Sequence, residues 1–428
     1  MLSKSSLAVL GGSPVIQSPF SKYSTIDSSD IEQAIRVMES GSLSQFIGDA
    51  GEYFLGGPEV RKFESNFSKL FSIEHAISMN SWTSGLWAAV GALGLEPGSE
   101  VITSSWTMAA TATTILHWNL VPVFADIDHQ TFNLNPKDVE SKITKRTRAI
   151  ISPDIFGQSA DIEALLKICK KHDLFLVSDT AQSPMAKRNG YFAGTASHIA
   201  GFSFNYHKHI HTGEGGMLIT DNPEFADRLQ LLRNHGEVVL SRRQQSDLMY
   251  GIMGMNMRLG EIESAIGINQ LTKLEGAIIS RRNAASRFTD GIKDLPGLSV
   301  PFVDSGNDHV YYVYGIKIDQ SMTAVSREKI IAALKAEGVP SLMPGYQNLH
   351  KLPLFREQLT YKNNNVPYSL IPKKRAKELK SQILPVTEEI HNESFIGINW
   401  CAHNYLDSEV DSLIHAFQKV WGSLEKLR

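Results

Sequence analysis

A single lysine, Lys208, stands among histidines in the stretch SFNYHKHIHTGEGGMLIT, which ends in a glycine-rich turn and a short apolar run. The histidines alternate along the chain and are His207, His209 and His211. Alternating histidines could form a ligand set for a metal ion, whereas a lone lysine before glycines suggests covalent carbonyl chemistry. The remaining sequence has to separate these two hypotheses.

The spacing of the histidines argues against a metal ion. On a strand, residues two apart share a face, so the three side chains would point the same way. They would also span about 13 Å at roughly 3.3 Å per residue. Zinc needs all its ligands at about 2.1 Å, which this row cannot provide. We therefore predict no metal ligands and keep a histidine-cluster metal protein only as a remote alternative.

The lysine hypothesis requires a carboxylate that can hold an electron-withdrawing cofactor. Asp179 directly follows the apolar stretch LFLVS, so it lies at the carboxyl end of an expected buried strand. Ligands bind at this end of the strands in open α/β sheets. A carboxylate there could pair with a protonated pyridine nitrogen. The alternative, that Asp179 is a helix N-cap or turn residue, stays open from its position alone.

A third signal is the stretch SMNSWTSGLWAAVGAL, in which an expected strand gives way to small hydroxyl residues and then a helix. Hydroxyls and free backbone N–H groups at a helix start bind phosphate well, although a plain N-cap is an equally good explanation. Ser203, five residues before Lys208, could add another hydroxyl. In this order, phosphate cup, carboxylate, serine and lysine describe pyridoxal phosphate held at three points. The hydroxyl residues at the helix start are Ser81, Thr83 and Ser84.

The elements that must position these residues follow an alternating β/α pattern. Seven short β-rich runs lie between about residues 72 and 220, and most are separated by enough chain for a crossover helix. This pattern predicts an α/β fold with a mostly parallel seven-stranded sheet sandwiched by helices. Later segments predict a smaller α+β domain. We expect a large cofactor-binding domain over residues 1–285, whose N-terminal segment could pack on the small domain, and the small C-terminal domain over residues 286–428.

Composition limits the partners and the compartment. The chain has 428 residues, 42% hydrophobic and 20% charged, with a formal net charge of −3, so we expect no nucleic-acid or membrane partner. Two cysteines, Cys169 and Cys401, make a disulfide framework improbable and fit a reducing compartment. The N-terminus is too weakly apolar for a signal peptide, and no apolar run reaches membrane-spanning length. We therefore expect a cytoplasmic protein.

Several motifs, taken together and in order, resemble the DegT/StrS-type sugar and cyclitol aminotransferases, which are fold type I pyridoxal-phosphate enzymes. The matching stretches run along nearly the whole chain: LAVLGGSPV, FLGGPEVRKFE, PGSEVITSSWTMAATA, VPVFADIDHQTFNLNP, DTAQS, SFNYHKHIHTGEGG and GMNMRLGEIESAIGINQL. The resemblance implies pyridoxal 5'-phosphate as the cofactor.

The resemblance also implies a role for each matching residue. Lys208 would be the catalytic residue that forms the aldimine with the cofactor and later moves the proton, and Asp179 would bond the pyridine nitrogen. Asn256 would reach the cofactor phosphate of the neighbouring subunit, which implies a homodimer with shared active sites. The other matching cofactor-binding positions are Trp82, Thr83, Met108, Gln182 and Ser203.

Two positions depart from the family pattern. Trp82 stands where many members have the small residue of a Ser-Gly-Thr motif. Met108 stands where members often have an aromatic residue stacked on the cofactor, so either Met108 or the nearby Trp106 could cover the ring.

One branch of the family replaces the lysine by histidine and dehydrates its substrate. Aligned on Ser203 and Glu214, the catalytic position of this chain falls on Lys208, which favours transamination. We therefore predict an aminotransferase that moves an amino group from L-glutamate or L-glutamine to a ketosugar, nucleotide-linked or free, or to a ketocyclitol. Such reactions serve amino-sugar, surface-polysaccharide or antibiotic biosynthesis. A pyridoxal-phosphate-dependent sugar dehydratase or cofactor-binding regulator is the alternative.

The sequence contains few features that indicate which acceptor the enzyme uses. The stretch LAVLGGSPV is similar to leaders of cyclitol- and aminobenzoate-forming members, which favours an acceptor without a nucleotide. Two basic clusters could instead meet a diphosphate or be plain solvated surface: Arg242 with Arg243, and Lys373, Lys374, Arg375 and Lys377. Tyr346 and His350, in PGYQNLHKLPLF, are candidates on the substrate side, with a packing or turn role equally compatible.

Overall fold

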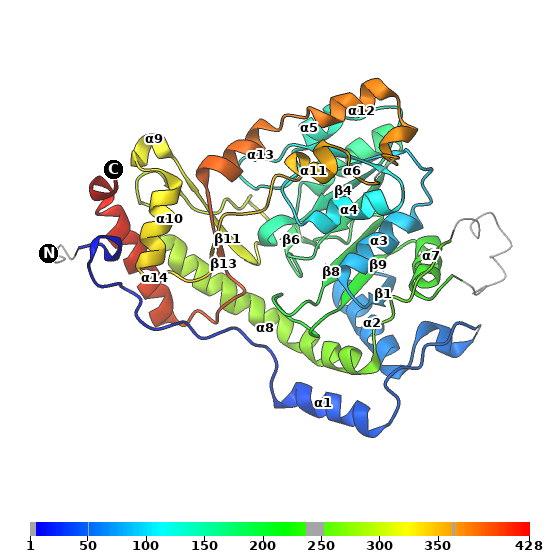
Figure 1. Ribbon diagram of the computed structural model, residues 1–428. Helices are drawn as coiled ribbons and strands as arrows, with labels where there is room; N and C mark the ends of the chain where they lie inside the picture. Colours follow the sequence, from blue (N-terminus) through cyan, green and yellow to red (C-terminus); the bar gives the residue numbers. More distant parts are fainter. Residues whose placement is uncertain (1–5, 50, 237–251, 362–363) are drawn as a thin grey trace.

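The structure, a computed structural model, describes residues 6–49, 51–236, 252–361 and 364–428. It contains a large sheet covered by helices and a smaller four-stranded sheet, and the long helix α8 (Glu261–Ile292) runs between these two parts (Figure 1). The basic pair Arg242 and Arg243 lies outside the described residues.

The large sheet has seven strands, and each matches one of the β-rich runs of the sequence. Strand β9 is antiparallel to both of its neighbours, and all other pairs are parallel. The strands, in their order across the sheet, are β1 (His75–Met79), β9 (Gly216–Thr220), β8 (Ile199–Ser203), β5 (Phe175–Asp179), β4 (Thr147–Pro153), β2 (Glu100–Ser104) and β3 (Val121–Ala125).

Both faces of the large sheet are buried, which explains why its strands are continuously apolar. On β1, Ile77 packs in the hydrophobic cluster with α3 and α7, and its neighbour Ala76 packs in the cluster with α2 and α8. Side chains alternate along a strand, so one strand supplies both layers. The helices that follow the sheet strands are α3 (Trp82–Ala92), α4 (Ala109–His117), α5 (Pro136–Ser141), α6 (Ile162–His172) and α7 (Pro223–Arg233).

Two helices precede the large sheet: α1 (Ser28–Glu39) and α2 (Pro58–Phe71). In α2 a proline stands at the first turn, where its missing N–H costs nothing, and Ser72 ends the helix in the left-handed conformation. The buried side chains of α2 recur every three or four residues and are Val60, Phe63, Phe67 and Phe71. This spacing places one face of α2 against α8 and the sheet.

The second sheet contains β10 (Leu298–Ser299), β11 (Val313–Ile318), β13 (Phe395–Asn399) and β12 (Leu342–Met343), all antiparallel. Its core includes residues from α8, α10 (Arg327–Ala336) and α14 (Asp407–Trp421). Leu7 and Phe20 from the N-terminal segment belong to the same core, so the start of the chain packs on this second part.

The chain returns to the large sheet after β12. Apolar residues between 349 and 384, from α11 (Pro353–Arg356) to α12 (Lys373–Lys380), pack in one cluster with side chains of β2, β3 and β4. The expected boundary between residues 285 and 286 falls inside α8. The remaining short elements are β6 (Lys187–Arg188), β7 (Tyr191–Phe192), α9 (Gln320–Thr323), α13 (Pro385–Glu389), η1 (Ala8–Leu10), η2 (Glu52–Leu55), η3 (Ile155–Gly157), η6 (Leu349–Lys351), η7 (Tyr368–Leu370), η8 (Ile390–Ser394) and η9 (Leu424–Leu427).

The predicted fold class is confirmed: a mostly parallel seven-stranded sheet lies between helices and is joined to a smaller α+β part. Within the described ranges, none of the helices combines the length and the apolar character needed to cross a lipid bilayer.

Candidate active site

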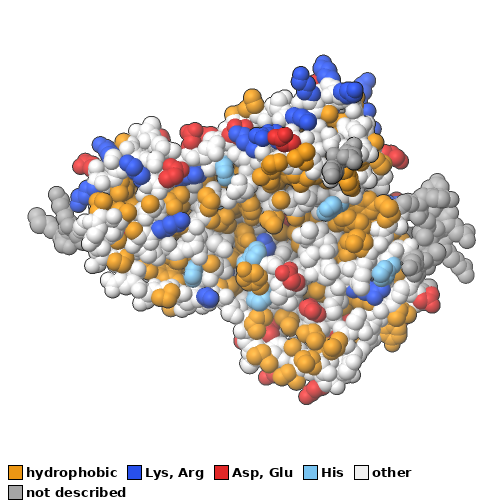
Figure 2. All heavy atoms as spheres, viewed as in Figure 1, with side chains coloured by type: hydrophobic (Ala, Val, Ile, Leu, Met, Phe, Trp, Pro, Cys, Tyr) orange, Lys and Arg blue, Asp and Glu red, His pale blue; other side chains and the backbone are white. Residues whose placement is uncertain are grey.

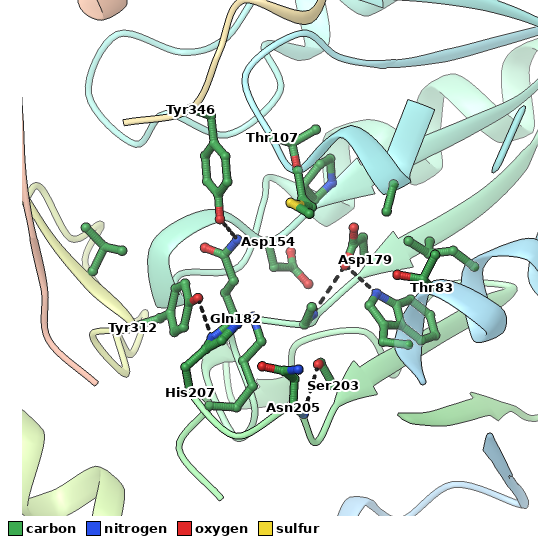
Figure 3. Close-up of a pocket in the computed structure, with 18 of the residues that line it drawn as sticks. Thr83, Thr107, Asp154, Asp179, Gln182, Ser203, Asn205, His207, Tyr312 and Tyr346 are labelled. Carbon is green, nitrogen blue, oxygen red and sulfur yellow. Dashed lines mark hydrogen bonds between the residues drawn. The ribbon is translucent and has the colours of Figure 1, made fainter. Parts of the chain in front are cut away.

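A cavity of about 400 Å³ opens at the carboxyl ends of the parallel strands β4, β5 and β8 (Figure 3). This is where the topology of an open α/β sheet places a ligand. Residues from both parts of the molecule line it. Those expected from the sequence are Trp82, Thr83, Met108, Asp179, Gln182, Ser203, Lys208 and Tyr346.

Lys208 lies in the turn after β8 and is only 7% exposed. Its backbone N–H donates to the Asn205 carbonyl, which holds the turn, and its ammonium group lies 4.2 Å from the centre of the Tyr312 ring. Burial lowers the pKa of Lys208 to about 8, although the charge of Asp179 acts to raise it. Near neutral pH a fraction of this amine is therefore unprotonated and able to attack a carbonyl carbon.

Asp179 is the last residue of β5 and is also 7% exposed. The Trp82 indole N–H donates to its Oδ1 at 2.6 Å, and the Thr111 hydroxyl donates to its Oδ2 at 2.8 Å. Buried carboxylates need such partners because an unpaired one would lose its hydration without compensation. The two donors fix the direction in which the carboxylate faces the cavity.

The N-terminus of α3 supplies the expected phosphate cup. Ser81 acts as the N-cap, since its side chain accepts the Ser84 N–H at 3.1 Å. The Thr83 side chain is exposed at the cavity, and the first backbone N–H groups of a helix have no partner within the helix. Ser203, at the end of β8, lines the same cavity and accepts the Asn205 N–H. Hydroxyls and helix N–H groups are a suitable donor set for a phosphate.

Gln182 connects the two parts of the molecule across the cavity. Its amide donates to the Tyr346 hydroxyl at 2.8 Å, and its carbonyl oxygen accepts the Phe156 N–H at 2.8 Å. The Tyr346 ring is parallel to that of Phe156, with 6.0 Å between the ring centres. Tyr346 thus lies at the cavity.

His350 lies elsewhere. Its ring bonds Ser105 Oγ at 2.6 Å and Glu388 at 3.0 Å, it is 5% exposed, and it is not among the residues that line the cavity. These contacts join η6 to α13 and to the residue that follows β2, which is a packing role.

The two candidates for covering the cofactor ring have different positions. Trp106 is fully buried between Phe132, Phe156 and Phe395 and does not itself line the cavity. Met108 lines the cavity and is 59% exposed. A flexible, polarisable methionine can cover an aromatic ring.

Asn256 is exposed, pairs with Asn234 in an isolated β-bridge, and does not line the cavity of its own chain. A role in this site would require the side chain to serve another copy of the chain.

Further cavity residues were not expected from the sequence, and Asp154, at the end of β4, is the most prominent. Its carboxylate accepts the Ala160 N–H and the Thr180 hydroxyl, both at 2.8 Å. Burial, with a smaller contribution from the charge of Asp179, raises the pKa of Asp154 to about 7. The signal was available, because Asp154 follows a buried strand just as Asp179 does. The other unexpected lining residues include Thr107, Asn205, His207, Tyr312 and Asn399.

The three histidines do not converge on one point. His207 Nδ1 bonds the Tyr312 hydroxyl at 2.9 Å, His209 Nε2 bonds the Val310 carbonyl at 2.8 Å, and His211 accepts the Gly213 N–H. Burial lowers the pKa of His207 to about 4 and that of His209 to about 3, so both rings are neutral. The described part of the chain contains no group of side chains placed to hold a metal ion.

Comparison with known proteins agrees with this site. The family described as the DegT/DnrJ/EryC1/StrS aminotransferases matches residues 11–395. The chain is 33% identical to the spore coat polysaccharide biosynthesis protein SpsC of Bacillus subtilis, over 83% of this chain and 90% of that protein. It is 31% identical to the putative L-glutamine:3-amino-2,3-dideoxy-scyllo-inosose aminotransferase of Streptoalloteichus tenebrarius, over 99% and 100%.

Among solved structures, the aminotransferase PseC of Helicobacter pylori superposes with a TM-score of 0.77 at 25% identity, covering 95% of this chain and 99% of that one. The chain therefore belongs to the DegT/DnrJ/EryC1/StrS aminotransferase family. It is a fold type I aminotransferase, and the family implies pyridoxal phosphate as its cofactor.

The residues present fit that cofactor. An amine with a lowered pKa, a carboxylate at a strand end, and a cup of hydroxyl and helix N–H groups line one cavity. These are the groups needed to meet an aldehyde, a pyridine nitrogen and a phosphate, respectively. The aminotransferase function is thus supported over the dehydratase, regulator and metal-protein alternatives.

Proposed function

We propose that this enzyme transfers an amino group from L-glutamate or L-glutamine to a polyhydroxylated keto acceptor, either a ketosugar or a ketocyclitol. The observation that carries the proposal is the buried Lys208 amine in one cavity with Asp179 and neutral hydrogen-bonding side chains. Relatives named for such substrates support it, above all the full-length match to the putative scyllo-inosose-type aminotransferase, whose name gives L-glutamine as donor.

In this proposal each cavity residue has one task. Pyridoxal phosphate supplies the aldehyde that takes up the amino group and a ring that withdraws electrons from the substrate carbon. The neutral Lys208 amine would take the proton from that carbon and, once protonated, would return it to the carbon that came from the cofactor's aldehyde, on the other side of the nitrogen. Asp179 holds the ring nitrogen, and Thr83 and Ser203 hold the phosphate. Gln182 and Met108 also line the cavity, where Gln182 would lie beside the ring and Met108 would cover it.

The acceptor side of the cavity favours a neutral ring with hydroxyl groups. Among the described residues that line the cavity, Lys208 is the only lysine or arginine. Hydrogen-bonding side chains without charge are present instead: Thr107, Asn205, Tyr346 and Asn399. The basic cluster at α12 does not line the cavity, and Arg375 of that cluster is paired with Glu100 at 2.7 Å. We infer that the acceptor carries no diphosphate bound by these residues.

We also propose a homodimer in which each subunit completes the other's active site. Helix α1 supports it, because the helix buries a charged residue against α8 while three of its large apolar side chains are exposed. Its buried Asp30 accepts bonds from residues of α8, whereas Ile31, Ile35 and Met38 are 53%, 47% and 61% exposed. Figure 2 shows hydrophobic side chains gathered on the lower lobe, where Figure 1 places α1. An apolar face of this kind is stabilised by a second copy.

The cellular compartment we propose is the cytoplasm. Support comes from Cys169 and Cys401, which are both free and buried, as expected for a protein that matures in a reducing environment.

An acceptor screen tests the proposed function. Apoenzyme is loaded with pyridoxamine phosphate and mixed with free ketosugars, nucleotide-linked ketosugars or ketocyclitols. The readouts are the return of the pyridoxal phosphate absorbance and the mass of the amine product. We expect turnover with a free ketosugar or ketocyclitol and none with Lys208→Ala. Turnover only with nucleotide-linked ketosugars would contradict the inferred absence of a diphosphate.

A further inference from the structure

The tryptophan at position 82 is placed to act on the cofactor's carboxylate partner. Its indole N–H donates to Asp179 Oδ1 at 2.6 Å (Figure 3). The Thr111 hydroxyl donates to the other oxygen at 2.8 Å. Each carboxylate oxygen therefore has one side-chain donor, and these two donors come from different helices, α3 and α4. Oδ1 also accepts a longer bond from the Ala181 backbone N–H, at 3.4 Å. A carboxylate held from both sides cannot rotate freely about its Cβ–Cγ bond.

Two glycines leave the space that this indole ring occupies. A Cβ atom at Gly201 would lie 2.1 Å from Trp82 Cζ3, and one at Gly85 would lie 2.7 Å from Trp82 Cε3. Gly201 is the register partner of Asp179 in the neighbouring strand β8, so the glycine opens space beside the carboxylate. Trp82 itself is 6% exposed. The ring is thus fixed between helix and sheet, and its N–H direction is fixed with it.

The position of the bond matters because a carboxylate acts on a pyridine nitrogen only when its oxygen faces that nitrogen. Hydrogen bonds to an ionised group are also stronger than those between neutral groups, since donor and charge attract. A donor fixed by packing therefore both stabilises the charge of Asp179 and aims it.

We propose that Trp82 is a positioning residue, whose indole N–H, together with the Thr111 hydroxyl, holds Asp179 ready for the ring nitrogen of pyridoxal phosphate. This proposal rests on the assignment of Asp179 made under the proposed function. It assigns to Trp82 a task that a small residue at this position could not perform, because only the indole spans the distance to the carboxylate.

The test is a double-mutant cycle on cofactor affinity rather than on activity. Trp82→Phe keeps an aromatic ring in the space but removes the N–H together with part of the bicyclic ring. Titration of the apoenzyme with pyridoxal phosphate should show a dissociation constant raised roughly ten- to hundred-fold, the range for a hydrogen bond to a charged group. In an Asp179→Asn background the same substitution should change the constant less than about two-fold, because coupled residues are not additive.

Matched variants separate this role from packing. Trp87→Phe makes the same change five residues along α3, where the side chain packs on Trp118 outside the cavity, and should leave the constant unchanged. Thr111→Val, which removes the second donor, should weaken binding as Trp82→Phe does. The pH midpoint of the visible cofactor band should shift in Trp82→Phe and not in Trp87→Phe.

Three results overturn the proposal. The first is an unchanged constant in Trp82→Phe. The second is an equal loss in both backgrounds, which would mean that Trp82 acts through packing or through the phosphate cup. The third is an unchanged constant in Asp179→Asn, which would remove the assigned role of Asp179 as well. A failed acceptor screen contradicts only the proposed substrate, because none of these readouts involves a substrate.

Discussion

Burial shifts the pKa values of two side chains of this cavity in opposite directions. It lowers the pKa of Lys208 to about 8 and raises that of Asp154 to about 7, because in both cases the low-dielectric surroundings disfavour the charged form. The same pocket therefore holds an amine that is partly neutral near pH 8 and a carboxyl group that is partly protonated near pH 7. Both groups can exchange protons near neutral pH, where a general acid or base is most effective.

The Lys208 amine should titrate at a much lower pH than the amine of an exposed lysine. Its lowered pKa means that the reactive, neutral amine is already half-formed near pH 8 instead of near 10.5. Competitive labelling of the apoenzyme with a trace of a small amine-reactive reagent, quantified by peptide mass spectrometry, should show this midpoint. Exposed Lys374 in the same sample serves as the internal reference. A midpoint for Lys208 close to that of Lys374 would show that burial does not activate the amine.

Asp154 should make the apoenzyme less stable as the pH rises. Its folded pKa of about 7 exceeds the ordinary value of 3.8, so the folded state binds the extra proton between these values and loses that advantage toward pH 7. Asp154→Asn removes the titration. Its amide oxygen can still accept the Ala160 N–H, and its NH2 group can donate to the Thr180 hydroxyl, which donates to the carboxylate in the wild type. We expect the free energy of unfolding of the variant, relative to wild type, to increase by roughly 1–3 kcal/mol between pH 5 and pH 8.

Urea denaturation of both apoproteins at the two pH values measures this difference. Parallel pH profiles of wild type and Asp154→Asn would mean that the carboxyl group is already ionised at pH 5.

At the scale of elements, the sequence predicted the strands well. It predicted the residues and segments that pack around the strands less well. The seven strands of the large sheet are short apolar runs buried on both faces, and such runs leave a strong pattern. Asp179 and Ser203 each end one of these strands and Lys208 follows closely, so topology alone brings them to one edge of the sheet. Asp154 directly follows the last residue of β4 and could have been found by the same rule.

Other site residues depend on contacts that no periodicity reveals. Tyr312 precedes β11 in the second sheet, and its place over Lys208 follows from how the two parts of the molecule pack. Thr111 is on the inner face of α4, where a threonine resembles any buried helix residue. The return of residues 349–384 to the large sheet was also not predicted, because this stretch is polar and rich in turns.

The ion pair between Arg375 and Glu100 anchors that returning segment. Arg375 on α12 donates to both oxygens of Glu100, at 2.7 and 3.1 Å, and Glu100 is fully buried at the start of β2. Arg375→Met should lower the free energy of unfolding by roughly 2–4 kcal/mol, because it leaves a buried charge without its partner. Chemical denaturation measures the loss.

The neighbouring Lys374 provides the control, since it is exposed on the same helix. Lys374→Met should change the free energy of unfolding by less than about 0.5 kcal/mol. Equal effects of the two substitutions would show that the ion pair contributes nothing beyond the loss of a surface charge.

For the whole molecule, the proposed dimer explains two features that a single chain does not explain. One is the outward apolar face of α1, and the other is Asn256, exposed and away from its own cavity. Ile35→Asp places a charge in the middle of that face without touching the interior. We expect it to shift the particle mass toward the 47.4 kDa of one chain in light scattering. A mass that stays at twice this value would place the subunit contact on another surface.

Mixed dimers test whether the active sites are shared. Lys208→Ala removes the amine from a subunit's own cavity, whereas Asn256→Ala, on the proposed arrangement, weakens only the cavity of its partner. In a heterodimer of the two variants, one cavity carries both changes and the other carries neither, so half of the wild-type sites are restored. Activity at limiting pyridoxal phosphate should therefore rise when the two variants are unfolded and refolded together. If each site is built from one chain, every cavity still carries one of the two substitutions. Mixing the variants then does not restore activity.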